Sequence, residues 1–140
     1  MPNNPITPKL IDHVVIRVRR LEPALAFYRD VIGCSIEKEQ AGIGLYQLRA
    51  GQSLIDLVDV DGHLGQLYSS APARNAPNMD HFCLQVDPWN ADAIIAHLKS
   101  HGVVVGDVEQ RYGARGYGPS LYINDPEGNT VELKGPPAAT

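Results

Sequence analysis

Two stretches of this 140-residue chain, 11-IDHVVIRV-18 and 79-MDHFCLQV-86, each place an aspartate–histidine pair ahead of a run typical of a β-strand. Each is followed by apolar residues at helical spacing, and each helical pattern ends at a glycine, Gly33 or Gly102. Three further strand-like runs complete each half. The sequence therefore predicts a β-α-β-β-β unit written twice, which indicates an internal duplication.

The two halves are expected to fold as modules with the same order of elements. In the first half we expect a strand, a helix and three strands at Leu10–Val18, Leu21–Ile32, Ser35–Gln40, Ile43–Arg49 and Ser53–Val60. In the second half we expect them at Met79–Val86, Asn90–His101, Val103–Gln110, Ser120–Asn124 and Asn129–Lys134. The predicted fold class is α+β, with two tandem βαβββ modules.

The length of the chain fits one domain, which we place at residues 10–134 with repeats at 10–60 and 79–134. Residues 1–9 and 135–140 are expected to form a flexible lead and tail. Residues 61–78 are rich in Gly, Ser, Ala, Pro and Asn, so they form an inter-module loop that acts as a linker or as a mobile lid.

Composition argues against several classes of protein. Apolar residues at 44% and charged residues at 20% are ordinary for a soluble globular domain. A net charge of −4 argues against a nucleic-acid partner, and apolar runs of only strand length argue against a membrane span. Cys34 and Cys83 are too few for a disulfide framework, and no secretory signal is recognisable, so we expect free thiols and a cytoplasmic location.

The opening strand of each half has one apolar face and one mixed face, because alternate residues of a strand point the same way. The mixed faces carry His13 and Arg17 in the first strand, and His81 and Gln85 in the fifth. The apolar faces are expected to meet the helices. The mixed faces are therefore more plausible as the wall of a pocket than as part of the core.

Superposing the two halves pairs His13 with His81, and Asp56 with Glu132. Two imidazoles and one or two carboxylates suit a divalent ion such as Zn, Ni, Fe, Mn or Co, with coordination positions left open. Asp56 has a shorter side chain than Glu132, so it ligates directly, ligates through water, or acts as a base. The alternative is that both histidines are ordinary strand residues with satisfied hydrogen bonds. Because the histidines and the carboxylates both occupy matching positions in the two repeats, a metal site is favoured.

The segment 111-RYGARGYGPS-120 combines flexible glycines with cationic and aromatic side chains. It is either an exposed hairpin loop or a mouth loop that grips an anionic or aromatic substrate. The candidate substrate-binding residues are Arg17, Gln85, Arg115, Tyr117 and Tyr122. His97 and His101 have the i, i+4 spacing of a zinc pair, but the helix ends at once, so we interpret them as a solvated helix end.

With 26-AFYRDVIG-33 closing the first helix and 124-NDPEGNTVEL-133 near the end, the chain resembles the vicinal oxygen chelate superfamily. That superfamily includes glyoxalase I, the bleomycin-resistance proteins and extradiol dioxygenases. The resemblance implies a curved, cleft-enclosing mixed sheet with the helices outside. It also implies that His13, His81 and Glu132 are metal ligands, while Asp56 stands where glyoxalase I has a glutamate that is both ligand and base.

The function implied by this resemblance is that of a divalent-metal-dependent, glyoxalase-like enzyme of lyase or isomerase type. The metal would bind vicinal oxygens of a small-molecule substrate, with Glu132 and Asp56 as the catalytic carboxylates. One alternative is an extradiol-type Fe(II) dioxygenase, and another is a non-catalytic small-molecule-binding or drug-resistance module. Two modules must face each other to enclose a cleft, within one chain or across two, and we expect a homodimer.

Overall fold

The computed structural model describes residues 4–67, 71–73 and 75–138, so parts of the predicted lead, loop and tail (1–3, 68–70, 74 and 139–140) lie outside the described residues. The first module comprises β1 (His13–Val18), α1 (Leu21–Ala26), β2 (Ser35–Gln40), β3 (Leu45–Ala50) and β4 (Ser53–Asp59). The second comprises β5 (Phe82–Gln85), α2 (Ala91–Ser100), β6 (Glu109–Gly113), β7 (Gly116–Asn124) and β8 (Thr130–Lys134). Short helical turns η1 (Phe27–Val31), η2 (Ala41–Ile43) and η3 (Gly65–Leu67) complete the fold.

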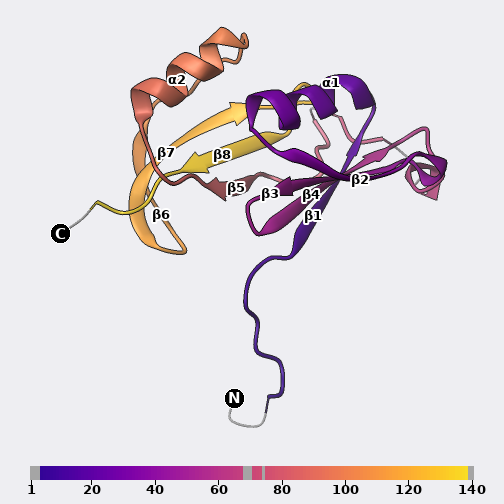
Figure 1. Ribbon diagram of the computed structural model, residues 1–140, viewed down its shortest axis with the longest axis horizontal. Helices are drawn as coiled ribbons and strands as arrows, with labels where there is room; N and C mark the ends of the chain where they lie inside the picture. Colours follow the sequence, from indigo (N-terminus) through magenta and orange to yellow (C-terminus); the bar gives the residue numbers. More distant parts are fainter. Residues whose placement is uncertain (1–3, 68–70, 74, 139–140) are drawn as a thin grey trace.

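Each module forms its own four-stranded mixed sheet, in the orders β1-β4-β3-β2 and β5-β8-β7-β6 (Figure 1). The first and last strands of each module pair in parallel, and the remaining neighbours are antiparallel. Val15 pairs with Asp56 in one module, and Cys83 pairs with Glu132 in the other. The predicted tandem βαβββ fold is confirmed, as two four-stranded sheets.

The core lies on the apolar faces that strand alternation predicts. Ile16 and Val18 of β1 are fully buried, whereas His13 and Val15, one position out of phase, are exposed. Both helices lie along the upper side of the view in Figure 1. The mixed faces are therefore left open. Among the described residues no helix is long and apolar enough to cross a membrane.

The first helix is shorter than predicted, because α1 ends at Ala26 and the chain continues as a π-helical turn over Phe27–Val31. The backbone N–H of Ile32 donates to the carbonyl of Phe27 at 3.0 Å, five residues back. The turn ends at Gly33, whose φ of +93° is a conformation that glycine adopts without steric cost.

The predicted strand at Val103–Gln110 is wrong in part, whereas a hairpin at Arg111–Ser120, one of the two alternatives for that segment, is present. Residues 103–108 form a connection without regular structure, and the strand β6 begins only at Glu109. In the glycine-rich segment the strand pairing of the β6–β7 hairpin extends to Gly113 and Gly116, so the loop itself is shorter than expected. The hairpin register pairs Tyr112 with Tyr117, and these cross-strand aromatic contacts favour a ladder that the glycines alone do not predict.

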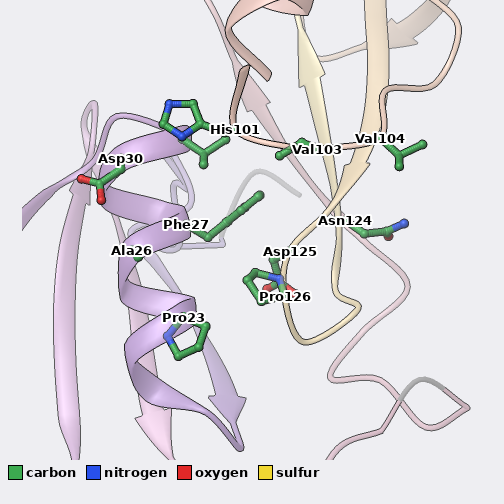
Figure 2. Close-up of a pocket in the computed structure, with 12 residues that line it drawn as sticks. Pro23, Ala26, Phe27, Asp30, His101, Val103, Val104, Asn124, Asp125 and Pro126 are labelled. Atoms are coloured by element: carbon green, nitrogen blue, oxygen red, sulfur yellow. The ribbon is translucent and has the colours of Figure 1, made fainter. Parts of the chain in front are cut away.

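A groove of about 540 Å³ lies where the two modules meet (Figure 2). One wall is α1 with the π-helical turn, and the other is made by residues 101–104 and 124–126. None of the residues predicted to bind metal or substrate lines this groove.

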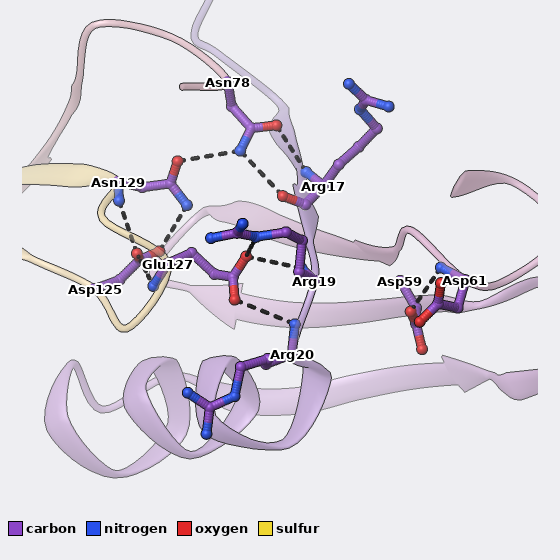
Figure 3. A network of polar contacts seen from close by, with 9 residues as sticks. All are labelled: Arg17, Arg19, Arg20, Asp59, Asp61, Asn78, Asp125, Glu127 and Asn129. Carbon is purple, nitrogen blue, oxygen red and sulfur yellow. Dashed lines mark hydrogen bonds and ion pairs between the residues drawn. The ribbon is translucent and has the colours of Figure 1, made fainter. Parts of the chain in front are cut away.

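The D-P-E-G-N turn, residues 125–129, holds the second module against the first (Figure 3). The Glu127 carboxylate accepts hydrogen bonds from the backbone N–H groups of Arg19 at 2.7 Å and Arg20 at 3.1 Å. These N–H groups lead into α1 and have no intrahelical partner. The turn that precedes β8 therefore also joins the modules.

Candidate metal centre

The first pair of candidate ligands lies on the open face of module 1. Asp56 in β4 is only 4% exposed, and its Oδ2 accepts a hydrogen bond from Gln47 Nε2 at 3.2 Å. Its Oδ1 is buried and has no hydrogen-bond partner among the described residues. The negative charge of Asp56 acts on His13, at the start of β1. A buried carboxylate oxygen without a partner is costly, so this atom is suited to receive a proton or a cation.

The second pair lies at the equivalent place in module 2. His81 directly precedes β5, and its Nε2 lies 3.3 Å from Oε1 of Glu132 in β8. Glu132 is buried. The strand pairing that places Glu132 beside Cys83 is the counterpart of the pairing between Asp56 and Val15. In both modules, therefore, the histidine stands two positions before the residue that pairs with the carboxylate.

Both histidines are held by the aspartate that precedes them. His13 Nδ1 lies 2.7 Å from Asp12 Oδ2, and His81 Nδ1 lies 2.5 Å from Asp80 Oδ2. The hydrogen bond to Asp12 raises the pKa of His13, and the charge of Asp56 adds to this effect. An aspartate that accepts the Nδ1 proton leaves Nε2 with the lone pair, which is how histidine ligands to metals are commonly oriented.

The His81–Glu132 distance provides a test of whether these residues fit a metal ion. With Nδ1–H directed at Asp80, the Nε2 lone pair faces a carboxylate oxygen, so the pair needs a cation or a proton between the two atoms. Metal–ligand bonds of about 2.1 Å place neighbouring ligand atoms about 3.0–3.4 Å apart for octahedral to tetrahedral angles. The observed separation of 3.3 Å lies in that range.

The four predicted ligands occur as two pairs, one per module. Within the described ranges, no three His, Cys, Asp or Glu side chains lie close enough together to hold one ion. A shared ion would therefore require the two open faces to approach each other, within one chain or between two chains.

Strand alternation places Gln85 on the same face as His81, and the strand register brings Tyr122 to that face by pairing it with Glu132. The Tyr122 ring packs edge-on against the His81 ring at 5.4 Å, and the Arg111 guanidinium lies 4.5 Å from the Tyr122 ring centre. Burial raises the pKa of Tyr122, and the charge of Glu132 adds to the rise. Tyr122 is therefore a protonated donor at neutral pH beside the candidate ligands.

The remaining predicted substrate-binding residues lie in three different settings. Arg17 shares the open face with His13, and its backbone N–H donates to the Asn78 side chain at 2.9 Å. Arg115, in the turn of the β6–β7 hairpin, forms an ion pair with Asp87 at 3.4 Å. Tyr117 is exposed and packs against Tyr112.

Sequence reasoning missed several residues that shape this site. The sequence shows Asp12 and Asp80 directly before the two histidines. That these aspartates hold the histidine rings follows only from their contacts with Nδ1. Gln47 was missed because its contact with Asp56 depends on the β3–β4 register. The sequence places Lys134 two positions after Glu132, on the same face of the strand, but sequence reasoning gave it no role in the site.

The family model that describes the Glyoxalase/Bleomycin resistance protein/Dioxygenase superfamily matches residues 10–133, nearly the whole folded part of the chain. The chain belongs to this superfamily. Divalent-metal use is typical of the glyoxalase superfamily.

Relatives within the glyoxalase superfamily differ in activity. The chain is 28% identical to methylmalonyl-CoA epimerase from Mus musculus, over 89% of this chain and 71% of the relative. Among solved structures, it is similar to a lactoylglutathione lyase from Agrobacterium tumefaciens, with 28% identity, a TM-score of 0.66, and 91% and 94% of the two chains covered. The virulence protein STM3117 from Salmonella typhimurium shares the fold, with a TM-score of 0.77, 22% identity, and 94% and 100% coverage.

Proposed function

We propose that this glyoxalase-superfamily protein is a divalent-metal-dependent enzyme of lyase or isomerase type that moves a proton on a small substrate with adjacent oxygens. The proposed ligands are His13, His81 and Glu132, with Asp56 as a fourth ligand or as the base. The observation that carries the proposal is the His81–Glu132 pair, whose facing ligand atoms are 3.3 Å apart. Epimerases and lyases among the relatives support the reaction type.

The residues of the chain divide the chemistry between them. A divalent ion, when bound, supplies a Lewis acid that stabilises negative charge on substrate oxygens. Asp56 has one oxygen held by Gln47 and one free, so the free Oδ1 is the atom that takes a proton from substrate. Tyr122 stays protonated at neutral pH and orients substrate beside His81. Gln85 and Arg17, on the same open faces, complete the proposed contacts with substrate.

The experiment that tests this proposal compares metal-loaded with metal-free protein. Protein loaded in turn with Zn, Ni, Co, Mn or Fe(II) is incubated with methylmalonyl-CoA in deuterated water, because an epimerase is among the relatives. We expect deuterium to enter the carbon between the two carbonyl groups, without oxygen uptake. Oxygen uptake with catechol and the iron-loaded protein would identify a dioxygenase instead, and the absence of both metal binding and turnover would favour a binding or resistance module.

The same assay separates a base from a ligand at Asp56. Asp56→Asn is expected to keep the fold and most of the bound metal, but to slow proton exchange by about 100-fold or more, because an amide cannot take up the proton. Asp59→Asn, three residues along the same strand, serves as the matched control and is expected to retain both. Full exchange activity in Asp56→Asn would remove its role as base, whereas complete loss of metal would make Asp56 a primary ligand.

We also propose that the protein is a homodimer. The two candidate ligand pairs lie in separate modules, and within the described residues no three candidate ligands come together. Two copies whose open faces meet would bring a pair from each chain together, and this supports the dimer. Light scattering is expected to give twice the chain mass, and a monomeric mass at all working concentrations would contradict the proposal.

The two cysteines also support the cytoplasmic location that we propose from the sequence. Cys34 is buried and Cys83 is exposed, and both are free thiols. Burial raises the pKa of the Cys34 thiol to about 11. The neighbouring protein atoms that partly shield Cys83 from water, together with the charge of Glu132, raise the pKa of its thiol to about 11 as well, so neither is a reactive thiolate at neutral pH. Unpaired cysteines suit a reducing environment, which supports the proposed cytoplasmic location.

A further inference from the structure

The open face of module 2 carries a buried lysine on the last strand, whereas the open face of module 1 has its cation, Arg17, on the first strand, paired with Val58. Lys134 lies two positions after Glu132 in β8, on the same side of the strand, and it is only 5% exposed. The corresponding position in module 1, two residues after Asp56, is Val58. The charge of Lys134 acts on the Cys83 thiol, which is paired with Glu132 in the sheet. The duplication has therefore diverged next to the candidate ligands.

Two glycines of the β6–β7 hairpin make room for this lysine. A Cβ atom at Gly113 would lie 2.9 Å from Lys134 Cε. A Cβ atom at Gly118 would lie 2.7 Å from the backbone oxygen of Gly135 and 2.9 Å from Lys134 Nζ. Gly113 therefore leaves the space that the Lys134 side chain occupies, and Gly118 leaves space for both the lysine and the backbone that follows it.

The Lys134 ammonium has few partners for a buried charge. Its Nζ donates to the carbonyl oxygen of Gly116 at 3.0 Å, and no carboxylate lies within ion-pair distance in the part of the chain that the structure describes. In contrast, the hairpin arginines are both paired, Arg111 with Glu109 and Arg115 with Asp87. An ammonium group carries three donors, and burying it without an anion is costly.

We propose that Lys134 is an anion-binding residue of the site, and that the natural substrate carries a carboxylate a few bonds from the oxygens that the metal would take. This inference rests on the function proposed above and adds the class of substrate to it. Residues two apart on a strand are about 7 Å apart at their Cα atoms, so the Lys134 side chain begins close to Glu132, and its ammonium lies at the carbonyl of Gly116 in the hairpin. The substrate carboxylate supplies the acceptors that the protein does not provide.

A matched pair of probes tests the proposal by calorimetry on nickel-loaded protein. Butanohydroxamate offers two adjacent oxygens to the metal and ends in a methyl group. The monohydroxamate of succinate has the same chelating end and a chain of similar length that ends in a carboxylate. We expect the wild type to bind the carboxylate-bearing probe about 10-fold more tightly or better, and Lys134→Met to lose that preference while binding butanohydroxamate normally.

Two further variants keep the test decisive if Lys134→Met fails to fold. Gly113→Ala adds a Cβ that meets only the flexible lysine side chain, so it is expected to fold, displace the ammonium and reduce the preference. Lys99→Met, on the surface of α2, is the control and is expected to keep the preference.

The possible failures point to different errors. A wild type without the preference, or a preference retained in both Lys134→Met and Gly113→Ala, would overturn the inference while leaving the metal site intact. A preference lost only in Arg115→Met would assign the anion to that arginine instead. No metal-dependent binding of either probe would overturn the proposed function, and the inference with it.

Discussion

Replacing His81 by alanine is expected to weaken divalent-metal binding by about 100-fold or more, because a direct ligand contributes more than an outer-shell partner, whose loss costs about 10–100-fold. His81 Nε2 faces the buried Glu132 carboxylate at 3.3 Å, so the substitution removes one of the two atoms that would hold the ion in module 2. Glu132→Gln and His13→Ala are expected to have losses of similar size. Competition with a chromogenic chelator measures each affinity without requiring a substrate.

Two variants calibrate this result. Asp80→Ala removes the carboxylate that holds His81 Nδ1, so it is expected to weaken metal binding by about 10-fold, less than loss of the ligand itself. His97→Ala is expected to leave the metal affinity unchanged, since His97 Nε2 contacts the Val31 carbonyl at the other side of the fold. Stoichiometric metal retained in the His13→Ala, His81→Ala double variant would disprove the proposed site.

Replacing Asp125 by alanine is expected to lower the free energy of unfolding by about 3 kcal/mol or more, because several buried donors would lose their acceptor together. Asp125 Oδ1 accepts from the backbone N–H groups of Glu127 at 2.9 Å and Asn129 at 2.8 Å. Its Oδ2 accepts from Asn129 Nδ2 at 2.9 Å and from the hydroxyl of Tyr28 at 2.7 Å. Burial raises the pKa of Tyr28 well above its usual value, so this hydroxyl remains a donor at neutral pH.

Urea unfolding at neutral pH measures the effect of Asp125→Ala. Tyr28→Phe removes one of the four donors and is expected to cost about 1 kcal/mol. Asp107→Ala, at an exposed aspartate, is the control and is expected to change stability by less than about 0.5 kcal/mol. A loss below about 1 kcal/mol in Asp125→Ala would show that the D-P-E-G-N turn does not hold the modules together.

The local pattern of the sequence predicted the modules, and it predicted that each module places a histidine and a carboxylate on its mixed face. Strand alternation has a period of two, so it places His13 and His81 opposite the residues that face the helices. The duplication then relates Asp56 to Glu132 without any knowledge of the packing. The helix stops at Gly33 and Gly102 were also predictable, because both have the positive φ that favours glycine.

A hairpin at Arg111–Ser120 was one alternative from the sequence, but the length of its paired strands was not predictable from local preferences. Glycine disfavours a regular strand, and the segment Arg111–Ser120 contains three of them. The requirement comes from another strand and the residue after it: the Lys134 side chain occupies the space that a side chain at Gly113 would need, and the Gly135 backbone together with Lys134 occupies that at Gly118. Composition alone therefore indicated a hairpin loop over the whole segment, whereas the strand pairing extends to Gly113 and Gly116.

By itself, the sequence determined that the chain has two βαβββ modules, each with a histidine and a carboxylate on its open face. Only the tertiary structure decided that Glu127 docks on the backbone ahead of α1, that each pair remains in its own module, and that Lys134 is buried beside Glu132. The reason is physical: periodicity and repeats report which side of an element a residue occupies. Contacts between elements distant in sequence depend instead on how whole modules pack.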